Sequence, residues 1–137
     1  MKHSLGVTSA VVFVSQLGRS VEFYRDVFAC SVAIQDRDAA LLRAPGGFQL
    51  YLIARGSRTR HPSGGIGLQY LIWSTDNADH FEHLEQALKD RGARIDIFTS
   101  GGVAFLEARD PDGIRVLTAY PSPTKLPRVF LSSRLYN

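Results

Sequence analysis

Hydrophobic and polar positions along the first half of the chain change from a strand pattern to a helix pattern and back. Val7–Val14 is apolar and mostly β-branched, which is typical of a largely buried strand. The next apolar residues recur at steps of three or four and predict an amphipathic helix that ends near Ala29: Leu17, Val21, Tyr24 and Phe28. Turn-forming residues then separate three predicted strands, Ser31–Gln35, Ala39–Ala44 and Phe48–Ala54.

The same order of patterns begins again after residue 65. Ile66–Trp73 predicts a strand, and Asp76 is placed to cap the helix that follows. That helix has an apolar stripe and ends at Gly92: Phe81, Leu84 and Leu88. The last three predicted strands include a pair joined by an Asp-Pro-Asp-Gly turn: Arg94–Phe98, Val103–Arg109 and Ile114–Tyr120. Each half therefore has the order βαβββ, and the predicted fold class is α+β with two tandem modules.

The repeat sets the expected domain organisation. We expect one domain over residues 1–137, made of module one (about 5–55), a linker (56–65), module two (about 66–120) and a tail (121–137). The linker is rich in Gly, Ser, Arg and Pro. The tail contains three prolines, and its apolar stretch 129–131 could dock on the domain or on a partner chain.

Composition narrows the class of protein. The chain is 45% hydrophobic and 21% charged, as expected of a globular protein, and no apolar run approaches the roughly 20 residues that span a bilayer. The start has no secretory signal pattern, and the single cysteine, Cys30, excludes an internal disulfide; both favour the cytoplasm. The net charge of +3 is scattered, and the most basic stretch, 55–60, has no interleaved aromatic residue, so we expect no nucleic acid partner.

Two segments carry a resemblance to a known family. VVFVSQLGRSVEFYRDVF resembles the opening strand and helix of the vicinal oxygen chelate superfamily, and RDPDGIRVL resembles the turn before its last strand. The superfamily includes glyoxalase I, ring-cleaving dioxygenases and bleomycin-resistance proteins. The resemblance spans roughly residues 5–120. It implies a curved mixed sheet around a ligand cleft, helices on the convex side, and a homodimer.

The resemblance also allows a test for a metal. Metal-using members of this superfamily place one donor on the first and last strand of each half. Counting from the shared motifs brings these positions to Ser9, Tyr51, Tyr70 and Leu117, with Gln49 within counting error of Tyr51. Divalent metals in such sites need imidazole or carboxylate ligands, so we expect no metal and no other cofactor. A separate pair, His80 and His83, has spacing that zinc accepts, but it also fits a solvated helix surface.

Strand alternation predicts which side chains line the cleft. The predicted ligand contacts are mainly aromatic and apolar with a few polar groups, as in small-molecule sites: Ser9, Phe13, Gln49, Tyr51, Tyr70, Phe105, Arg109, Arg115 and Leu117. Arg43, Arg109 and Arg115 could bind a carboxylate or phosphate, or could flank turns and extend into water. Tyr51 and Tyr70 could equally be core residues.

Three functions remain open at this point. The first is a metal-free protein that binds or sequesters a small, partly aromatic, neutral or acidic molecule. The second is an enzyme of the same superfamily (a lyase, isomerase or dioxygenase) with displaced or absent metal ligands, for which Glu107 is a weak candidate general base that also fits a surface charge. The third is a partner-binding module that uses the tail. Cys30 follows the C-terminal end of a helix, where a nucleophilic role is not expected.

Overall fold

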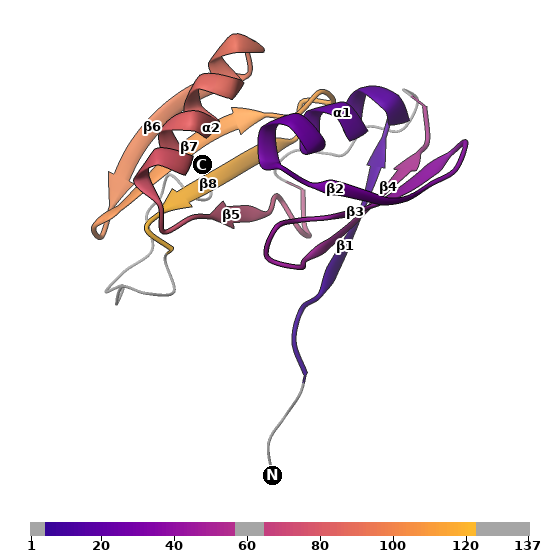
Figure 1. Ribbon diagram of the computed structural model, residues 1–137, viewed down its shortest axis with the longest axis horizontal. Helices are drawn as coiled ribbons and strands as arrows, with labels where there is room; N and C mark the ends of the chain where they lie inside the picture. Colours follow the sequence, from indigo (N-terminus) through magenta and orange to yellow (C-terminus); the bar gives the residue numbers. More distant parts are fainter. Residues whose placement is uncertain (1–4, 57–64, 123–137) are drawn as a thin grey trace. The chain divides into compact units, whose positions relative to one another are not determined.

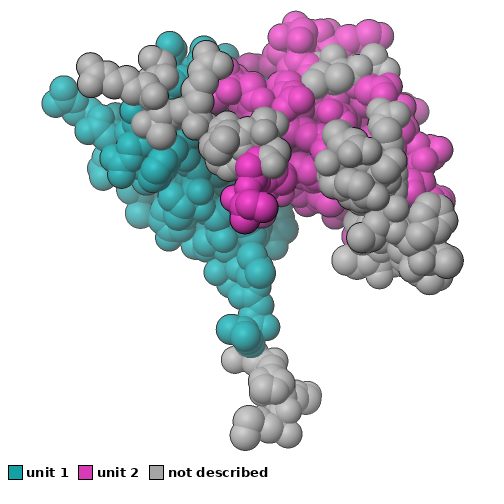
Figure 2. Space-filling view, turned by 180° about the vertical axis from the view of Figure 1, so that it is seen from behind, with its two compact units in different colours: residues 1–61 teal, residues 62–137 magenta. Residues whose placement is uncertain are grey.

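A computed structural model of the protein describes residues 5–56 and 65–122 (Figure 1). The chain divides into two compact units, residues 1–61 and residues 62–137 (Figure 2). Within the described residues, each unit contains one helix and one four-stranded mixed sheet in the order βαβββ. The predicted α+β class and the tandem repeat are therefore confirmed. Residues 57–64 of the expected linker and 123–137 of the expected tail lie outside the described residues.

The first unit places its helix on one face of its sheet. β1 (Ser9–Val14) and α1 (Leu17–Phe28) are followed by β2 (Ser31–Gln35), β3 (Ala39–Arg43) and β4 (Gln49–Ala54). The strand order is β1-β4-β3-β2, with β1 parallel to β4 and the other pairs antiparallel. α1 packs against β2, β3 and β4, so the apolar side chains on that face form the core. The most deeply buried of them are Val14, Leu42, Leu50 and Leu52.

The second unit repeats this arrangement. β5 (Ile72–Ser74) and α2 (Ala78–Asp90) are followed by β6 (Arg94–Ser100), β7 (Val103–Arg109) and β8 (Arg115–Tyr120). The order β5-β8-β7-β6 matches that of the first sheet, with β5 parallel to β8. α2 contacts β6 and β8 and buries the predicted stripe of Phe81, Leu84 and Leu88.

Local hydrogen bonds determine where α1 ends and where α2 begins. α1 ends at Phe28 and has Ala29 as its C-cap, close to the predicted end, because Ala29 adopts the left-handed conformation (φ 57°) and its N–H donates to the Tyr24 carbonyl. The predicted cap of α2 is wrong by one residue. Asn77 is the N-cap: its side-chain oxygen accepts from the backbone N–H of Asp79 and His80. The Asp76 carboxylate instead accepts from the backbone N–H of Ser122 at 3.0 Å.

The predicted strand Ile66–Trp73 is also too long. Only Ile72–Ser74 pairs with β8. Before it, the Gln69 side-chain amide donates to the carbonyls of Gly65 (2.6 Å) and Gly67 (3.0 Å), so these backbone groups bond within the segment rather than to a neighbouring strand. Gly67 adopts φ 131°, a conformation that strand residues with side chains avoid. No described helix is long and apolar enough to cross a membrane.

Candidate functional site

The repeat is regular enough to identify equivalent positions in the two units. The helix N-caps, Gln16 and Asn77, are 61 residues apart (77 − 16), and so are Ser9 and Tyr70 (70 − 9). Tyr51 lies opposite Val11 in the β1–β4 ladder, and Leu117 lies opposite Ile72 in the β5–β8 ladder. Because Val11 and Ile72 are equivalent by the same offset, Tyr51 and Leu117 are equivalent too. The four positions tested as metal donors therefore form two equivalent pairs, Ser9 with Tyr70 and Tyr51 with Leu117.

The chemistry of these four side chains does not fit a divalent metal. Leu117 has no donor atom and is fully buried. Burial raises the pKa of the Tyr70 hydroxyl above its ordinary value, an effect that Arg115 opposes and Glu107 increases, so this phenol is neutral at pH 7. The Ser9 hydroxyl donates to Gln49 Oε1 at 3.3 Å. In the parts of the chain that the structure describes, no three His, Cys, Asp or Glu side chains form a group that could hold a metal ion.

An aromatic and aliphatic cluster occupies the face of the second sheet opposite α2. Phe98 on β6 and Phe105 on β7 are paired in register, and their rings stack with centroids 5.2 Å apart. Phe105 is 1% exposed and belongs to a buried cluster that Tyr70 and Phe98 border; its other members are Val103, Leu117 and Ala119. Sheet register places Glu107 and Arg115 on the same face as Phe105 and Leu117.

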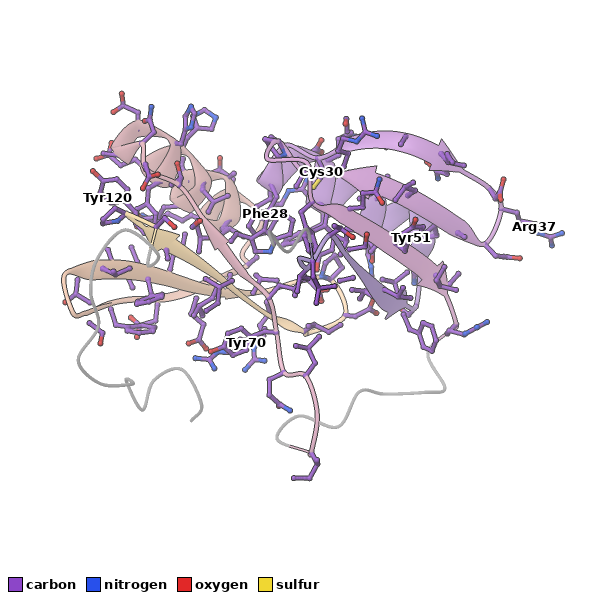
Figure 3. All side chains as sticks on the ribbon, turned by 90° about the horizontal axis from the view of Figure 1, so that it is seen from below. Phe28, Cys30, Arg37, Tyr51, Tyr70 and Tyr120 are labelled. Carbon is purple, nitrogen blue, oxygen red and sulfur yellow. The ribbon has the colours of Figure 1, made fainter. Side chains whose placement is uncertain are left out.

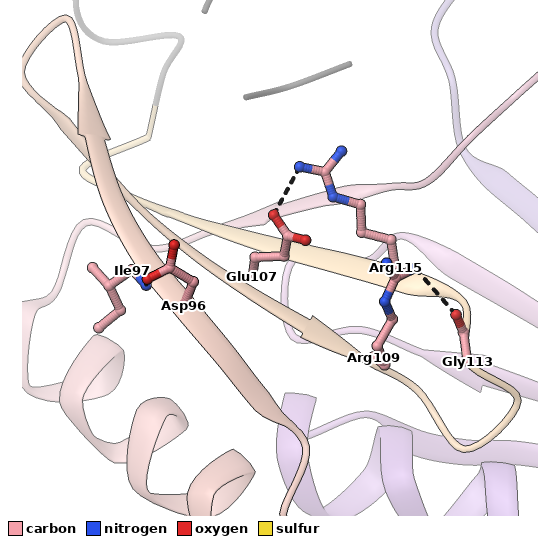
Figure 4. Close-up of polar contacts among 6 residues, drawn as sticks. All are labelled: Asp96, Ile97, Glu107, Arg109, Gly113 and Arg115. Carbon is pink, nitrogen blue, oxygen red and sulfur yellow. Dashed lines mark hydrogen bonds and ion pairs between the residues drawn. The ribbon is translucent and has the colours of Figure 1, made fainter. Parts of the chain in front are cut away.

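One ion pair lies beside this cluster (Figure 4). The Arg115 guanidinium donates from Nη2 to Glu107 Oε1 at 2.8 Å, and the two side chains are only 13% and 14% exposed. The Arg115 guanidinium carbon also lies 4.7 Å from the centroid of the Tyr70 ring, a cation–π contact. Tyr70 is labelled in Figure 3, on the segment that leads into β5. These three residues, Tyr70, Glu107 and Arg115, form the polar cluster of the second unit.

The structure separates the three predicted arginines. Arg115 is largely buried and paired, so it does not extend into water as a turn-flanking side chain would. Arg109 is exposed and donates from Nη1 to the Gly113 carbonyl at 3.3 Å. Arg43 is exposed at the end of β3. Glu107 is not a surface charge, and its partner is Arg115 on the next strand rather than Arg109 on its own strand.

The remaining predicted ligand contacts belong to the first unit. Ser9, Phe13, Gln49 and Tyr51 share the face of the first sheet opposite α1, because β1 and β4 pair in register. Phe13 is 52% exposed, and the Arg55 guanidinium carbon lies 4.7 Å from its ring centroid. Val11, between Ser9 and Phe13 on this face, is 64% exposed, so the face is apolar and accessible.

Two other candidates have structural explanations. Cys30 is buried, and desolvation raises the pKa of its thiol to about 11, which agrees with the expectation that it is not a nucleophile. His80 and His83 are exposed on α2, as expected for a solvated helix face.

Two residues near the polar cluster were missed by the sequence reasoning. Phe98 stacks on Phe105, and Asp96 lies opposite Glu107 in the β6–β7 ladder. Both fall within the predicted strand Arg94–Phe98, so extending the strand alternation to this strand would have found them.

Two βαβββ units in one chain, each with a mixed sheet covered on one face by a helix, define the class of paired βαβββ proteins. A family profile described as "Glyoxalase/Bleomycin resistance protein/Dioxygenase superfamily" matches residues 6–118. The chain belongs to this superfamily, which is the one its two motifs resemble.

Solved structures of other proteins have the same fold. A glyoxylase/bleomycin resistance protein/dioxygenase domain from Frankia sp. EAN1pec aligns with a TM-score of 0.75 and 21% identity over 87% of this chain and 99% of that chain. A lactoylglutathione lyase from Agrobacterium tumefaciens aligns with a TM-score of 0.67 and 16% identity over 87% and 96%. The structure described as oxidase ChaP-H2 aligns with a TM-score of 0.71 and 15% identity over 93% of this chain and 98% of that chain. No curated protein matches the sequence. Identities this low show the fold alone.

Proposed function

We propose that this protein binds a small, partly aromatic organic molecule, neutral or acidic, without a metal ion. The observation that carries the proposal is the face of the second sheet opposite α2, where aromatic and aliphatic side chains border one largely buried ion pair. Small-molecule sites combine such an apolar lining with a few placed polar groups. Tyr70, Phe105, Glu107, Arg115 and Leu117 are the residues of the second unit on which the proposal rests.

The donor positions support the metal-free part of the proposal. A divalent ion bound through Ser9, Tyr51, Tyr70 and Leu117 would meet a hydroxyl, two phenols and a hydrocarbon instead of imidazole or carboxylate. These positions therefore lack the ligands that a metal would need in order to polarise substrate oxygens here. The first-unit residues Ser9, Phe13, Gln49 and Tyr51 remain predicted ligand contacts.

Native mass spectrometry of protein purified without added ligand tests the proposal. We expect an organic molecule to copurify and elemental analysis to find well under one metal ion per chain. Tyr70→Ala should reduce the fraction of chains that carry the copurified molecule, because Tyr70 borders the apolar cluster. The matched control is His83→Ala, an exposed substitution on α2 that should leave it unchanged. Stoichiometric Fe, Ni, Zn or Mn would overturn the metal-free proposal.

One observation favours the second candidate, an enzyme of the superfamily with displaced or absent metal ligands. Glu107 is a carboxylate beside Arg115 and the apolar cluster, and a carboxylate in such surroundings can accept a proton from a bound substrate. If Glu107 acts in this way, the copurified molecule should gain deuterium from D2O in the presence of the wild-type protein and not with Glu107→Gln. No exchange with either protein would leave binding as the function that the site supports.

A further inference from the structure

The polar cluster of the second unit has its positive charge already compensated. Arg115 and Glu107 form a 2.8 Å charge-assisted hydrogen bond, and each side chain is more than four-fifths buried. The guanidinium has five N–H donors and Glu107 accepts from Nη2, so a ligand carboxylate could approach the other N–H groups without displacing Glu107. It would nevertheless bring a second negative charge beside Glu107, and the single positive charge of Arg115 compensates only one of the two. Arg115 is therefore poorly suited to serve as the anion-binding residue of this face.

Glu107 has capacity for another hydrogen bond. Its Oε1 accepts from Arg115, and its Oε2 has no hydrogen bond to any residue in the described part of the chain. A carboxylate oxygen can only accept, and Oε2 is not one of the fully buried side-chain atoms that lack a partner, so a donor from water or a ligand can reach it. Oε2 therefore offers a ligand donor a strong, charge-assisted hydrogen bond.

The neighbouring charges indicate which kind of donor this position favours. Asp96 lies opposite Glu107 in the β6–β7 ladder, so an anionic ligand group here would meet carboxylates on two neighbouring strands. Asp96 Oδ1 accepts a hydrogen bond from the backbone N–H of Ile97 at 2.8 Å. Arg115 lies within hydrogen-bond distance of Glu107 and repels a cationic group. Arg109 lies opposite Arg115 in the β7–β8 ladder, is exposed and donates to the Gly113 carbonyl. An uncharged donor avoids both repulsions.

We infer that the ligand carries an uncharged hydrogen-bond donor on its aromatic part, such as a phenol or enol hydroxyl, and donates it to Glu107 Oε2. This inference rests on the proposed function and narrows it from a neutral or acidic molecule to a neutral one with a donor. Phe98 and Tyr70 border the apolar cluster next to the pair, which suits an aromatic ring beside the hydroxyl. Glu107 is thus the residue that sets specificity, and Arg115 holds its carboxylate in place.

Four probes with one aromatic skeleton test the inference by calorimetric titration at pH 7: 2-naphthol, 2-methoxynaphthalene, 2-naphthoate and 2-naphthylmethylammonium. A hydrogen bond to a charged group is strong enough that 2-naphthol should bind at least about tenfold more tightly than 2-methoxynaphthalene, which lacks the donor. Both charged probes should also bind more weakly than 2-naphthol.

Substitutions separate the role of Glu107 from that of its surroundings. Glu107→Gln removes the charge that compensates Arg115, so it should reduce the preference for 2-naphthol and increase the affinity for 2-naphthoate. Asp96→Asn keeps the ion pair and should weaken only the exclusion of 2-naphthoate, which provides a readout if Glu107→Gln fails to fold. Glu82→Gln, an exposed carboxylate on α2, is the matched control and should change none of the affinities.

The outcomes distinguish the inference from the function on which it rests. If 2-naphthol and 2-methoxynaphthalene bind equally, or if either charged probe binds most tightly, the inference is overturned while the proposed binding function stands. If none of the four probes binds, the proposed function is contradicted and the inference falls with it.

Discussion

Replacing Arg115 by methionine should be one of the most destabilising polar substitutions in this protein. The change keeps the length of the aliphatic side chain but removes the guanidinium that lies 2.8 Å from Glu107 and over the Tyr70 ring. Removing one partner of a buried ion pair costs about 3–5 kcal/mol, because the other charge stays buried without compensation. Since both side chains retain slight exposure, we expect the lower end, about 3 kcal/mol.

The assay is urea denaturation of the wild type and three variants. Arg115→Met should lower the free energy of unfolding, whereas the double variant Arg115→Met with Glu107→Leu should recover most of the loss, because no buried charge remains. The control is Arg25→Met. Arg25 pairs with Asp26 at 3.0 Å, but these side chains are 52% and 41% exposed, so no measurable change is expected.

The reasoning is refuted if Arg115→Met costs no more than Arg25→Met at pH 7, since the pair would then behave as a solvent-screened surface contact.

Four further predictions concern other parts of the protein. Asn77→Ala should cost about 1 kcal/mol in urea denaturation, because its side chain caps two backbone N–H groups, whereas Gln16→Ala at the equivalent position of α1, where the side chain makes no capping bond, should cost little. Ser20→Ala should raise stability by about 1 kcal/mol, since the buried Ser20 hydroxyl has no hydrogen-bond partner in the described residues; a loss would contradict this. Cys30 should resist Ellman's reagent at pH 8 until the protein is denatured, because burial raises the pKa of its thiol to about 11. The stability that the buried neutral thiol contributes should be fully present below pH 9.0, its ordinary pKa, and should be lost as the pH rises toward 11. The family resemblance leads us to expect a homodimer, so light scattering should give twice 15.1 kDa, and a monomer mass would contradict it.

The order of elements could be predicted from the sequence because it depends on local patterns. The apolar spacing from Leu17 to Phe28 and the strand Val103–Arg109 appear in the structure with the predicted bounds. The errors arose where one hydrogen bond decides between neighbouring residues. Asn77 rather than Asp76 caps α2 because its side chain reaches the N–H groups of residues 79 and 80. The first six residues of the predicted strand Ile66–Trp73 do not pair with β8, and in this segment the Gln69 side-chain amide donates to the carbonyls of Gly65 and Gly67.

The candidate site was predictable only in part. Strand alternation predicts from the sequence that Phe105, Glu107, Arg115 and Leu117 share one face, because alternation follows from the geometry of any strand. Which of these residues pair with one another depends on the register between β7 and β8, and a single strand contains no information about the register. The sequence alone thus determined the βαβββ repeat, the superfamily, and the absence of imidazole or carboxylate at the four donor positions. Only the tertiary structure decided that Arg115 pairs with Glu107 and is not left available to bind an anion. That pairing depends on β7 and β8 being in register and on the exclusion of water around the two side chains.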